Sequence, residues 1–344
     1  MSDPFAAPDA SPFGRRQRRP RGARIPVTVV TGFLGAGKTT LIRALLDRPE
    51  GADTAVVVNE FGEVGIDHAL LRSSSDTMVL LGNGCVCCAV RTDLQDSLRT
   101  LYAERAQGDV PNFQRVVIET SGLADPGPVL QTLASDRALG EAFHLQGLVT
   151  VIDAPGGAGN LDRMPEARHQ VALADRIVLT KADLADGAVV SALNTRLASL
   201  SAAPVMTATN GVIEPGFLLD ESLDLFARVA THQHDHAHAH SHGIDSFALF
   251  FAAPLPWPVF EQAMAVLTGL RGADLLRVKG LVAVEGCRGP VVVHAVQHVA
   301  HRPVELEDWP DDDRRSRLVF ITRNLAKAQV EQLFAAVTGV ARPA

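Results

Sequence analysis

Short, strongly apolar runs recur along the first two thirds of the chain, and each ends in a polar or glycine-bearing segment. Several are rich in valine and isoleucine, which is typical of strands buried on both faces. Segments with helical spacing, at residues 41–47, 92–102 and 166–173, separate some of them. Strands joined by long crossovers predict an α/β domain with a mainly parallel sheet over residues 25–225. The expected strands cover residues 25–30, 54–58, 77–81, 113–119, 146–153, 176–180 and 204–211.

The pattern changes in the last hundred residues. Runs of strands with a helix on each side predict a small α+β domain with an antiparallel sheet, covering residues 245–344. The expected strands are 246–252, 274–286, 291–299 and 317–322, and the expected helices are 258–267 and 324–337.

Three features of this second domain have an ordinary and a functional interpretation. The basic run at residues 276–280 either faces the first domain or a partner, or is an ordinary strand edge, which we favour. Cys287 is isolated, and we expect it to bind no metal. The remaining candidates are histidines that share a site or, as we expect, are scattered over the surface: His294, His298 and His301.

Residues 32–40 fit the phosphate-binding pattern G-x-x-x-x-G-K-[ST] at every position, between an apolar run and an amphipathic helix. The glycines let backbone N–H groups turn towards phosphate oxygens, and the helix N-terminus adds partial positive charge. Lys38 is expected to reach the β- and γ-phosphates and to act in catalysis, and the Thr39 hydroxyl to ligate Mg²⁺. The expected nucleotide-binding residues here are Gly32, Gly35, Ala36, Gly37, Lys38, Thr39 and Thr40.

Two later strand ends carry residues that suit the same nucleotide. An acid at the end of a core strand in a P-loop protein holds Mg²⁺ directly or through water, which assigns Glu119 to Mg²⁺ and to catalysis. Gly122 suits a loop that senses the γ-phosphate through a backbone N–H. Residues 180–183 resemble the guanine-reading N-K-x-D motif, with Lys181 over the base and Asp183 bonding guanine. The resemblance favours GTP over ATP, although Thr180 replaces the usual asparagine.

Three cysteines within four residues follow another predicted strand: Cys85, Cys87 and Cys88. Soft thiolates suit Zn²⁺, Co²⁺ or Cu⁺, and three of them leave a fourth position for Glu60, a histidine or water. A buried cysteine cluster and a redox pair are the alternatives, since Cys85 and Cys88 fit C-x-x-C.

The polar loop at residues 59–67 also follows a strand, where doubly wound sheets place ligands. It offers Glu60, Glu63 and Asp67 as candidates for Mg²⁺, for water or for a second metal, with Glu60 also as a catalytic candidate, unless it is an ordinary solvated loop.

Alternating histidines mark residues 226–244 as a linker between the two domains. Such low complexity is not expected to fold and suits weak capture of Zn²⁺, Co²⁺ or Ni²⁺, although a plain solvated linker is the alternative. The auxiliary ligands would be His232, His234, His236, His238, His240 and His242.

Composition excludes several classes. The net charge of −7 over 344 residues does not favour binding to nucleic acid or to an anionic membrane. No apolar run approaches the ~20 residues of a transmembrane helix, and no secretory signal is expected. Residues 1–24, rich in Pro, Gly, Ser and Arg, predict a disordered basic tail. With only four cysteines, the chain is expected in the reducing cytoplasm.

Taken together, the phosphate loop, residues 59–67, 84–88, 119–126 and 180–183 resemble the CobW family of metal-handling GTPases, which are similar to the nickel-inserting GTPases of hydrogenase and urease maturation. The resemblance implies a GTPase domain, a smaller C-terminal domain and a His-rich linker. It implies zinc, or cobalt in cobalamin-pathway members, at Cys85, Cys87 and Cys88, with Glu60 as an added ligand. No long His insertion lies near the cysteines, which favours zinc.

These observations lead to a functional hypothesis. Mg²⁺-GTP orders the loops at residues 59–67 and 119–125 and positions the thiolates, and slow, metal-modulated hydrolysis then releases the metal to a client metalloprotein. A homodimer is left open. The alternatives are a metal storage or buffer protein, cobalt handling in cobalamin biosynthesis, and a nucleotide-driven redox enzyme.

Overall fold

The computed structural model describes residues 24–59, 78–80, 89–201, 203–219, 244–300 and 303–341. The described chain forms two compact units that divide between residues 225 and 226. The strands of the first unit are β1 (Ile25–Gly32), β2 (Thr54–Asn59), β3 (Met78–Leu80), β4 (Arg115–Thr120), β5 (Phe143–Asp153), β6 (Arg176–Thr180) and β7 (Val205–Thr207). Its helices are α1 (Lys38–Leu46), α3 (Ala89–Gln107), α4 (Gly127–Ser135), α5 (Arg137–Ala142), α6 (Ala154–Arg163), α7 (Pro165–Leu173), α8 (Gly187–Leu200) and α9 (Pro215–Leu219), with 3-10 turns η2 (Pro49–Gly51) and η3 (Ala182–Leu184).

The seven strands form one sheet in the order β3-β2-β4-β1-β5-β6-β7, and every pairing is parallel. The predicted α/β fold with a mainly parallel sheet is therefore confirmed. From β1 the chain crosses to β2, which lies towards one edge of the sheet. Strand β5 lies next to β1 in the direction of the opposite edge. Such a reversal opens a crevice at the carboxyl ends of the strands, where open α/β sheets bind ligands.

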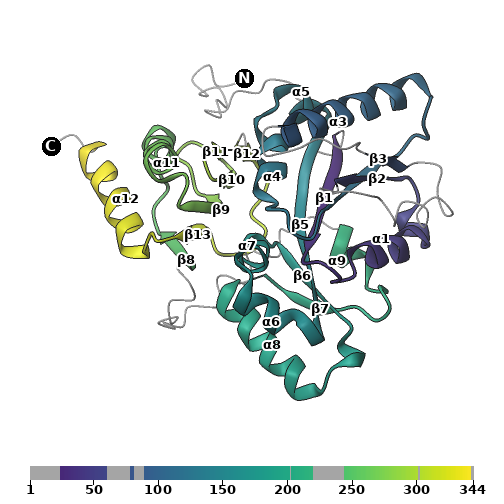
Figure 1. Cartoon of the computed structure of the whole chain (residues 1–344). Helices are drawn as coiled ribbons and strands as arrows, with labels where there is room; N and C mark the ends of the chain where they lie inside the picture. Colours follow the sequence, from purple (N-terminus) through teal and green to yellow (C-terminus); the bar gives the residue numbers. More distant parts are fainter. Residues whose placement is uncertain are drawn as a thin grey trace. The chain divides into compact units, whose positions relative to one another are not determined.

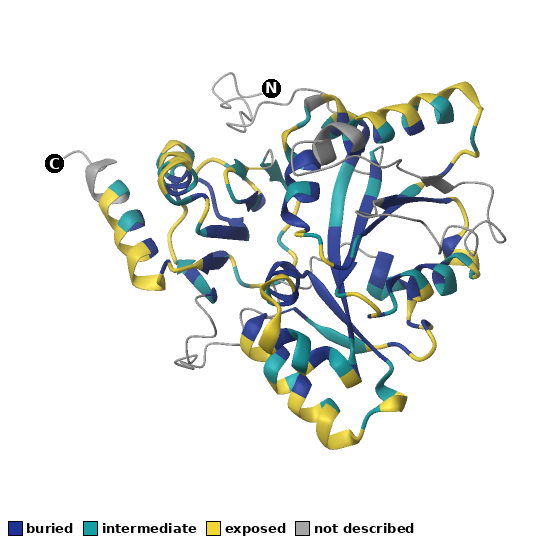
Figure 2. Cartoon of the chain, viewed as in Figure 1, coloured by how far each residue is buried: buried dark blue, intermediate teal, exposed yellow. Residues whose placement is uncertain are grey.

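Helices cover both faces of this sheet, with α1 and α9 on one side and α4 and α7 on the other (Figure 1). Alternate residues of one strand face opposite layers. Val178 of β6 packs in the core below α1, whereas Ile177 and Leu179 pack against α6, α7 and α8. The central strands are mostly buried in Figure 2, and the outer surfaces of α3 and α8 are exposed. Burial on both faces explains the nearly continuous apolar runs of the sequence.

Helices α4, α5, α6, α8 and α9 were not predicted, and α6 shows why most clearly. Its sequence contains three glycines, which are weak helix formers. The Asp153 side chain caps it by accepting a hydrogen bond from the Gly156 N–H at 3.0 Å. A Cβ on Gly157 would lie 2.7 Å from Ile152 Cγ2, so glycine allows close packing against the sheet. Tertiary packing therefore outweighs the poor local propensity.

The second unit contains β8 (Ile244–Phe251), α11 (Trp257–Arg271), β9 (Leu275–Val282), β10 (Val291–Val296), β11 (Val299–Ala300), β12 (Val304–Glu305), β13 (Ser316–Arg323) and α12 (Lys327–Ala341). Its antiparallel sheet runs β11-β10-β9-β13-β8, with β12 paired to β10, which confirms the predicted α+β class. Both helices contribute to one core, in which Phe320 stacks on Phe247 at 5.5 Å and meets Phe334 edge-on at 6.2 Å.

One prediction for this unit was wrong. The basic run at 276–280 is not an edge, because β9 lies between β10 and β13 and the Arg277 side chain is only 3% exposed. Strand order arises from long-range pairing, which a local run of basic residues does not encode. Helix α12 also begins at Lys327, three residues later than predicted.

Cys287, His294 and His298 lie in the part of the second unit that the structure describes. Cys287 packs against the apolar core. His298 Nδ1 lies 2.9 Å from the Thr268 carbonyl in the last turns of α11. His301 lies outside the described residues, and no group of three His, Cys, Asp or Glu among the described residues could hold a metal ion.

An ion-pair cluster before β13 makes the stability of this unit sensitive to acid. Arg315 donates to both carboxylate oxygens of Asp313, at 3.0 and 2.9 Å. This hydrogen bonding lowers the pKa of Asp313 from 3.8 to about 2. Its contribution is therefore complete above pH 3.8 and is lost as the pH falls from 3.8 towards 2.

We expect the free energy of unfolding to fall over this acid range by at most about 1 kcal/mol from this pair, because solvent screens it. Urea unfolding at several pH values measures the loss, and Asp313→Asn, which cannot titrate, should show a smaller one. Equal pH dependence of wild type and variant would contradict the assignment.

Candidate functional site

The loop between β1 and α1 has the backbone conformation that its glycines allow. Gly32, Gly35 and Gly37 have φ values of 144°, 73° and 93°, which side chains other than hydrogen disfavour. Gly37 is also the N-cap of α1, and no side chain among the described residues caps this helix end. The first N–H groups of α1 are therefore directed at the loop, an arrangement that suits a phosphate.

Side chains from the first turn of α1 and from the end of β4 lie close together beside this loop. Lys38 is 8% exposed, and its Nζ donates to the Gly32 carbonyl at 2.9 Å and to the Phe33 carbonyl at 3.3 Å. The Thr39 hydroxyl donates to Glu119 Oε1 at 2.7 Å. Glu119 lies opposite Val30 in the β1–β4 pairing, which brings the strand-end acid beside the first turn of α1.

The residues that resemble the guanine-reading motif contact the same loop from β6. The Thr180 hydroxyl donates to the Ala36 carbonyl at 2.7 Å and is also 3.2 Å from the Ile152 carbonyl. Lys181 adopts a positive φ of 54°, and its Nζ donates to the Gly35 carbonyl at 2.7 Å. Asp183 lies in η3 and is exposed. Thr180 in place of asparagine therefore still ties this strand end to the loop.

The loop after β4 lies directly against the phosphate loop. A Cβ added to Gly122 would lie 2.6 Å from the Leu34 amide nitrogen, so only glycine permits this approach. Helix α7 holds the other side of the loop, through contacts from His169 and Gln170 that sequence analysis missed. The available signal was a glutamine at an apolar helical spacing between Ala167 and Val171, an unusual place for a polar side chain.

Several predicted site residues lie outside the described residues. They are Glu60, Glu63, Asp67, Cys85, Cys87, Cys88, His232, His234, His236, His238, His240 and His242. The described elements on either side of the cysteine segment are β3, which ends at Leu80, and α3, which begins at Ala89. Leu80 pairs with Val58 of β2, which in turn lies opposite Glu119. The carboxyl end of β3 thus belongs to the same sheet edge as the phosphate loop.

The oxygen groups at this edge fit Mg²⁺. A hydroxyl and a carboxylate, those of Thr39 and Glu119, lie within hydrogen-bonding distance of each other next to the loop. Hard oxygen ligands of this kind are the ones that Mg²⁺ takes, together with water and substrate phosphates.

The parallel sheet order, the glycine loop, the adjacent Lys38 and the strand-end acid define a P-loop nucleotide-binding protein of the GTPase class. A family model described as CobW/HypB/UreG, nucleotide-binding domain, matches residues 26–207, and one described as the cobalamin synthesis protein cobW C-terminal domain matches residues 244–338. The chain belongs to this CobW/HypB/UreG family, as its motifs had indicated.

Relatives match almost end to end. The zinc chaperone YjiA of Escherichia coli is 36% identical over 324 residues, covering 90% of this chain and 98% of YjiA. The zinc chaperone CobW of Pseudomonas aeruginosa is 33% identical and covers 90% of each chain. The crystal structure of Zn(II)-bound YjiA GTPase from E. coli superposes with a TM-score of 0.71 at 32% identity, covering 91% of this chain and 99% of that one. These similarities extend across both units.

Proposed function

We propose that this chain is a GTP-hydrolysing metallochaperone that binds zinc at Cys85, Cys87 and Cys88, with Glu60 as an added ligand, and delivers it to a client metalloprotein. The observation that carries the proposal is the match over 90% of the chain to a protein named a zinc chaperone. The three thiolates are chemically suited to zinc. Cobalt, which also accepts thiolate ligands, is the second candidate cargo.

In this proposal the nucleotide binds at the carboxyl edge of the parallel sheet. The N–H groups of residues 32–40 and the Lys38 ammonium bind the phosphates, and Asp183 with Lys181 reads the guanine. Thr39 and Glu119 would hold Mg²⁺, which neutralises charge developing on the phosphates when bound. In the structure Glu119 accepts a hydrogen bond from the Thr39 hydroxyl, and this bond keeps both oxygen atoms at the N-terminal end of α1, beside the phosphate loop.

The cysteine segment and the phosphate loop follow strands of one sheet, which gives a physical route for coupling. GTP orders the loops at 59–67 and 119–125 and thereby positions the thiolates, and hydrolysis releases the zinc.

The proposal includes domain boundaries at 25–225, 226–244 and 245–344, auxiliary zinc capture by the histidines of 232–242, and a cytoplasmic location. No helix among the described residues is long and apolar enough to cross a membrane.

We expect one equivalent of Zn²⁺ to change the GTP turnover of metal-free protein, and Cys85→Ser/Cys87→Ser/Cys88→Ser to abolish that response. Because coupling is reciprocal, a non-hydrolysable GTP analogue should change zinc affinity by the same factor by which zinc changes analogue affinity, at least about fivefold. A chelator competition measures zinc affinity in the analogue-bound and GDP-bound states. A parallel titration with Co²⁺ compares the two cargoes.

The control is a His232–His242 deletion, which should keep the coupling and lose only weak sites. Zinc affinity that is the same with GTP analogue and with GDP would contradict metal delivery under GTP control. Loss of most zinc capacity on deletion of the histidines would point instead to storage.

A further inference from the structure

One side chain of helix α7, that of Gln170, makes two hydrogen bonds to the loop between β4 and α4. We call this pair of hydrogen bonds the fork. The two N–H groups of the Gln170 amide donate to the Gly122 carbonyl at 3.1 Å and to the Ala124 carbonyl at 3.0 Å. Gln170 is only 1% exposed; its hydrogen bond to the Gly122 carbonyl is buried, and the one to the Ala124 carbonyl is partly buried. A side-chain amide has two donors in a fixed plane, and here both are used on one short loop.

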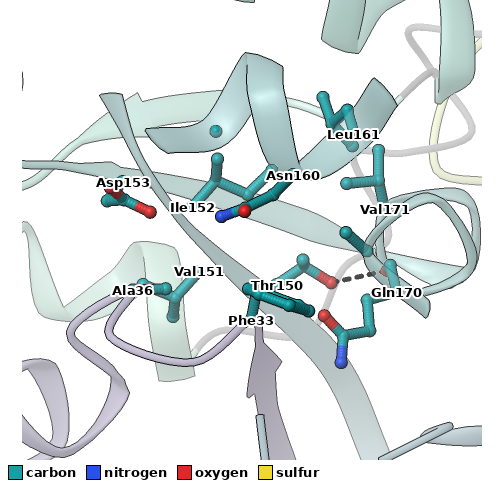
Figure 3. A pocket seen from close by; sticks show the side chains of 12 residues that line it. Phe33, Ala36, Thr150, Val151, Ile152, Asp153, Asn160, Leu161, Gln170 and Val171 are labelled. Carbon is teal, nitrogen blue, oxygen red and sulfur yellow. Dashed lines mark hydrogen bonds between the residues drawn. The ribbon is translucent and has the colours of Figure 1, made fainter. Parts of the chain in front are cut away.

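Gln170 is itself held firmly. The Thr150 hydroxyl of β5 donates to the Gln170 main-chain carbonyl at 2.7 Å, the dashed contact in Figure 3. Its neighbours Ala167 and Val171 are buried in the core formed with α6 and α8. The Gln170 side chain therefore extends from a tightly packed helix, and its two hydrogen bonds fix the loop relative to the sheet.

A neighbouring pair adds to this attachment. His169 Nδ1 lies 3.3 Å from Asp125 Oδ1, and the same oxygen accepts the Gly127 N–H at 2.8 Å, at the start of α4. His169 is 7% exposed. Consecutive residues of α7 thus contact both the middle and the end of the loop.

The clamped loop faces the phosphate loop on its other side. Gly122 lies against the backbone of Leu34, as the 2.6 Å approach of an added Cβ to the Leu34 nitrogen shows. Gln170 also lines a small pocket whose other walls include Phe33 and Ala36 of the phosphate loop (Figure 3). Because a trans peptide is planar, holding the Gly122 carbonyl also sets the direction of the Leu123 N–H.

We propose that Gln170 is a positioning residue that sets the loop 121–126 in the conformation that distinguishes GTP from GDP. The inference rests on the proposed function, because it takes the phosphate loop to bind GTP. In the proposed binding mode only the γ-phosphate would meet this loop, whereas the guanine and the inner phosphates would meet residues 32–40 and 180–183. Releasing the fork should therefore weaken GTP binding and leave GDP binding unchanged.

The test uses the full-length chain with Gln170→Glu, which keeps the size but places a carboxylate against two carbonyls, and Gln170→Leu. Calorimetry gives the dissociation constants for a non-hydrolysable GTP analogue and for GDP. We expect the analogue to bind about tenfold more weakly, which is about 1.4 kcal/mol, and GDP to bind as in wild type. Single-turnover GTP hydrolysis should slow as well.

Thr132→Val is the matched control. Thr132 is 1% exposed and its hydroxyl donates to the Pro128 carbonyl at 2.9 Å, so the variant loses a partly buried hydrogen bond in α4 without touching the fork. It should lower the melting temperature and leave the ratio of analogue to GDP affinity unchanged. Equal weakening of both ligands in the Gln170 variants, or no weakening, would overturn the proposal.

Hydrogen exchange of the wild type provides a second measurement if the variants do not fold. The amides of residues 123–125 and of Gly127 should exchange more slowly with the GTP analogue than with GDP, and equal rates would also overturn the proposal. A wild-type chain that does not bind the GTP analogue at all would refute the proposed function itself, and with it the role of Gln170. The wild-type titration therefore separates the two failures.

Discussion

Replacing Lys38 with methionine should weaken the binding of GTP by about 100-fold. In the structure the ammonium is 8% exposed and donates to the carbonyls of Gly32 and Phe33, so it is held inside the curve of the loop. A phosphate in that curve would gain charge-assisted hydrogen bonds that methionine cannot make. Their loss is worth about 3 kcal/mol, roughly 100-fold in the dissociation constant. Fluorescent GTP-analogue titration measures it.

Lys327→Met is the control for this prediction, because Lys327 is half exposed on α12 and forms a surface ion pair with Glu331 at 3.8 Å. That variant should bind nucleotide as the wild type does. Thermal melts of both variants separate lost binding from lost folding. If Lys38→Met were folded and bound GTP with wild-type affinity, the placement of the phosphates in the loop would be wrong.

Gly32→Ala should destabilise the first unit by about 3 kcal/mol or more. Gly32 has a φ of 144° and pairs with Val151 of β5 at the end of β1. A Cβ there would collide with the Val151 carbonyl oxygen, which belongs to a central strand and cannot move without disturbing the sheet. The backbone strain and the steric clash act together. The melting temperature should fall by about 6–12 °C.

Gly35→Ala in the same loop is the matched comparison. Gly35 also has a positive φ, 73°, but nothing lies within 4 Å of its added Cβ, so this variant carries the backbone strain without the clash. We expect it to cost about 1 kcal/mol. Differential scanning calorimetry of both variants gives the difference, and equal melting temperatures would show that the β1–β5 contact does not constrain position 32.

The buried fork at Gln170 illustrates what sequence analysis could not reach. Gln170 and Gly122 are separated by 48 residues, and they meet because α7 lies beside the loop that follows β4. Spacing along the helix marks Gln170 as an unusual polar residue on an apolar face, but it does not name the partner. The error at Arg277 has the same origin, because the position of β9 inside its sheet follows from pairing with β10 and β13.

The sequence by itself determined the features that depend on neighbouring residues. Nine consecutive residues, 32–40, specify a glycine loop between a strand and a helix. Nearly continuous apolar runs, typical of parallel strands buried on both faces, specified the α/β class. The order of the motifs along the chain indicated the family. These features are local because backbone conformation, burial period and motif chemistry are set within a few residues.

Only the tertiary structure decided which of these features meet. It placed β1 between β4 and β5, and thereby brought Thr39 within 2.7 Å of Glu119, 80 residues away. It also tied Thr180 to Ala36 across 144 residues and formed α6 from a glycine-rich segment. Strand order and helix packing depend on the summed burial of distant apolar residues, and this sum is not contained in any short stretch of the sequence.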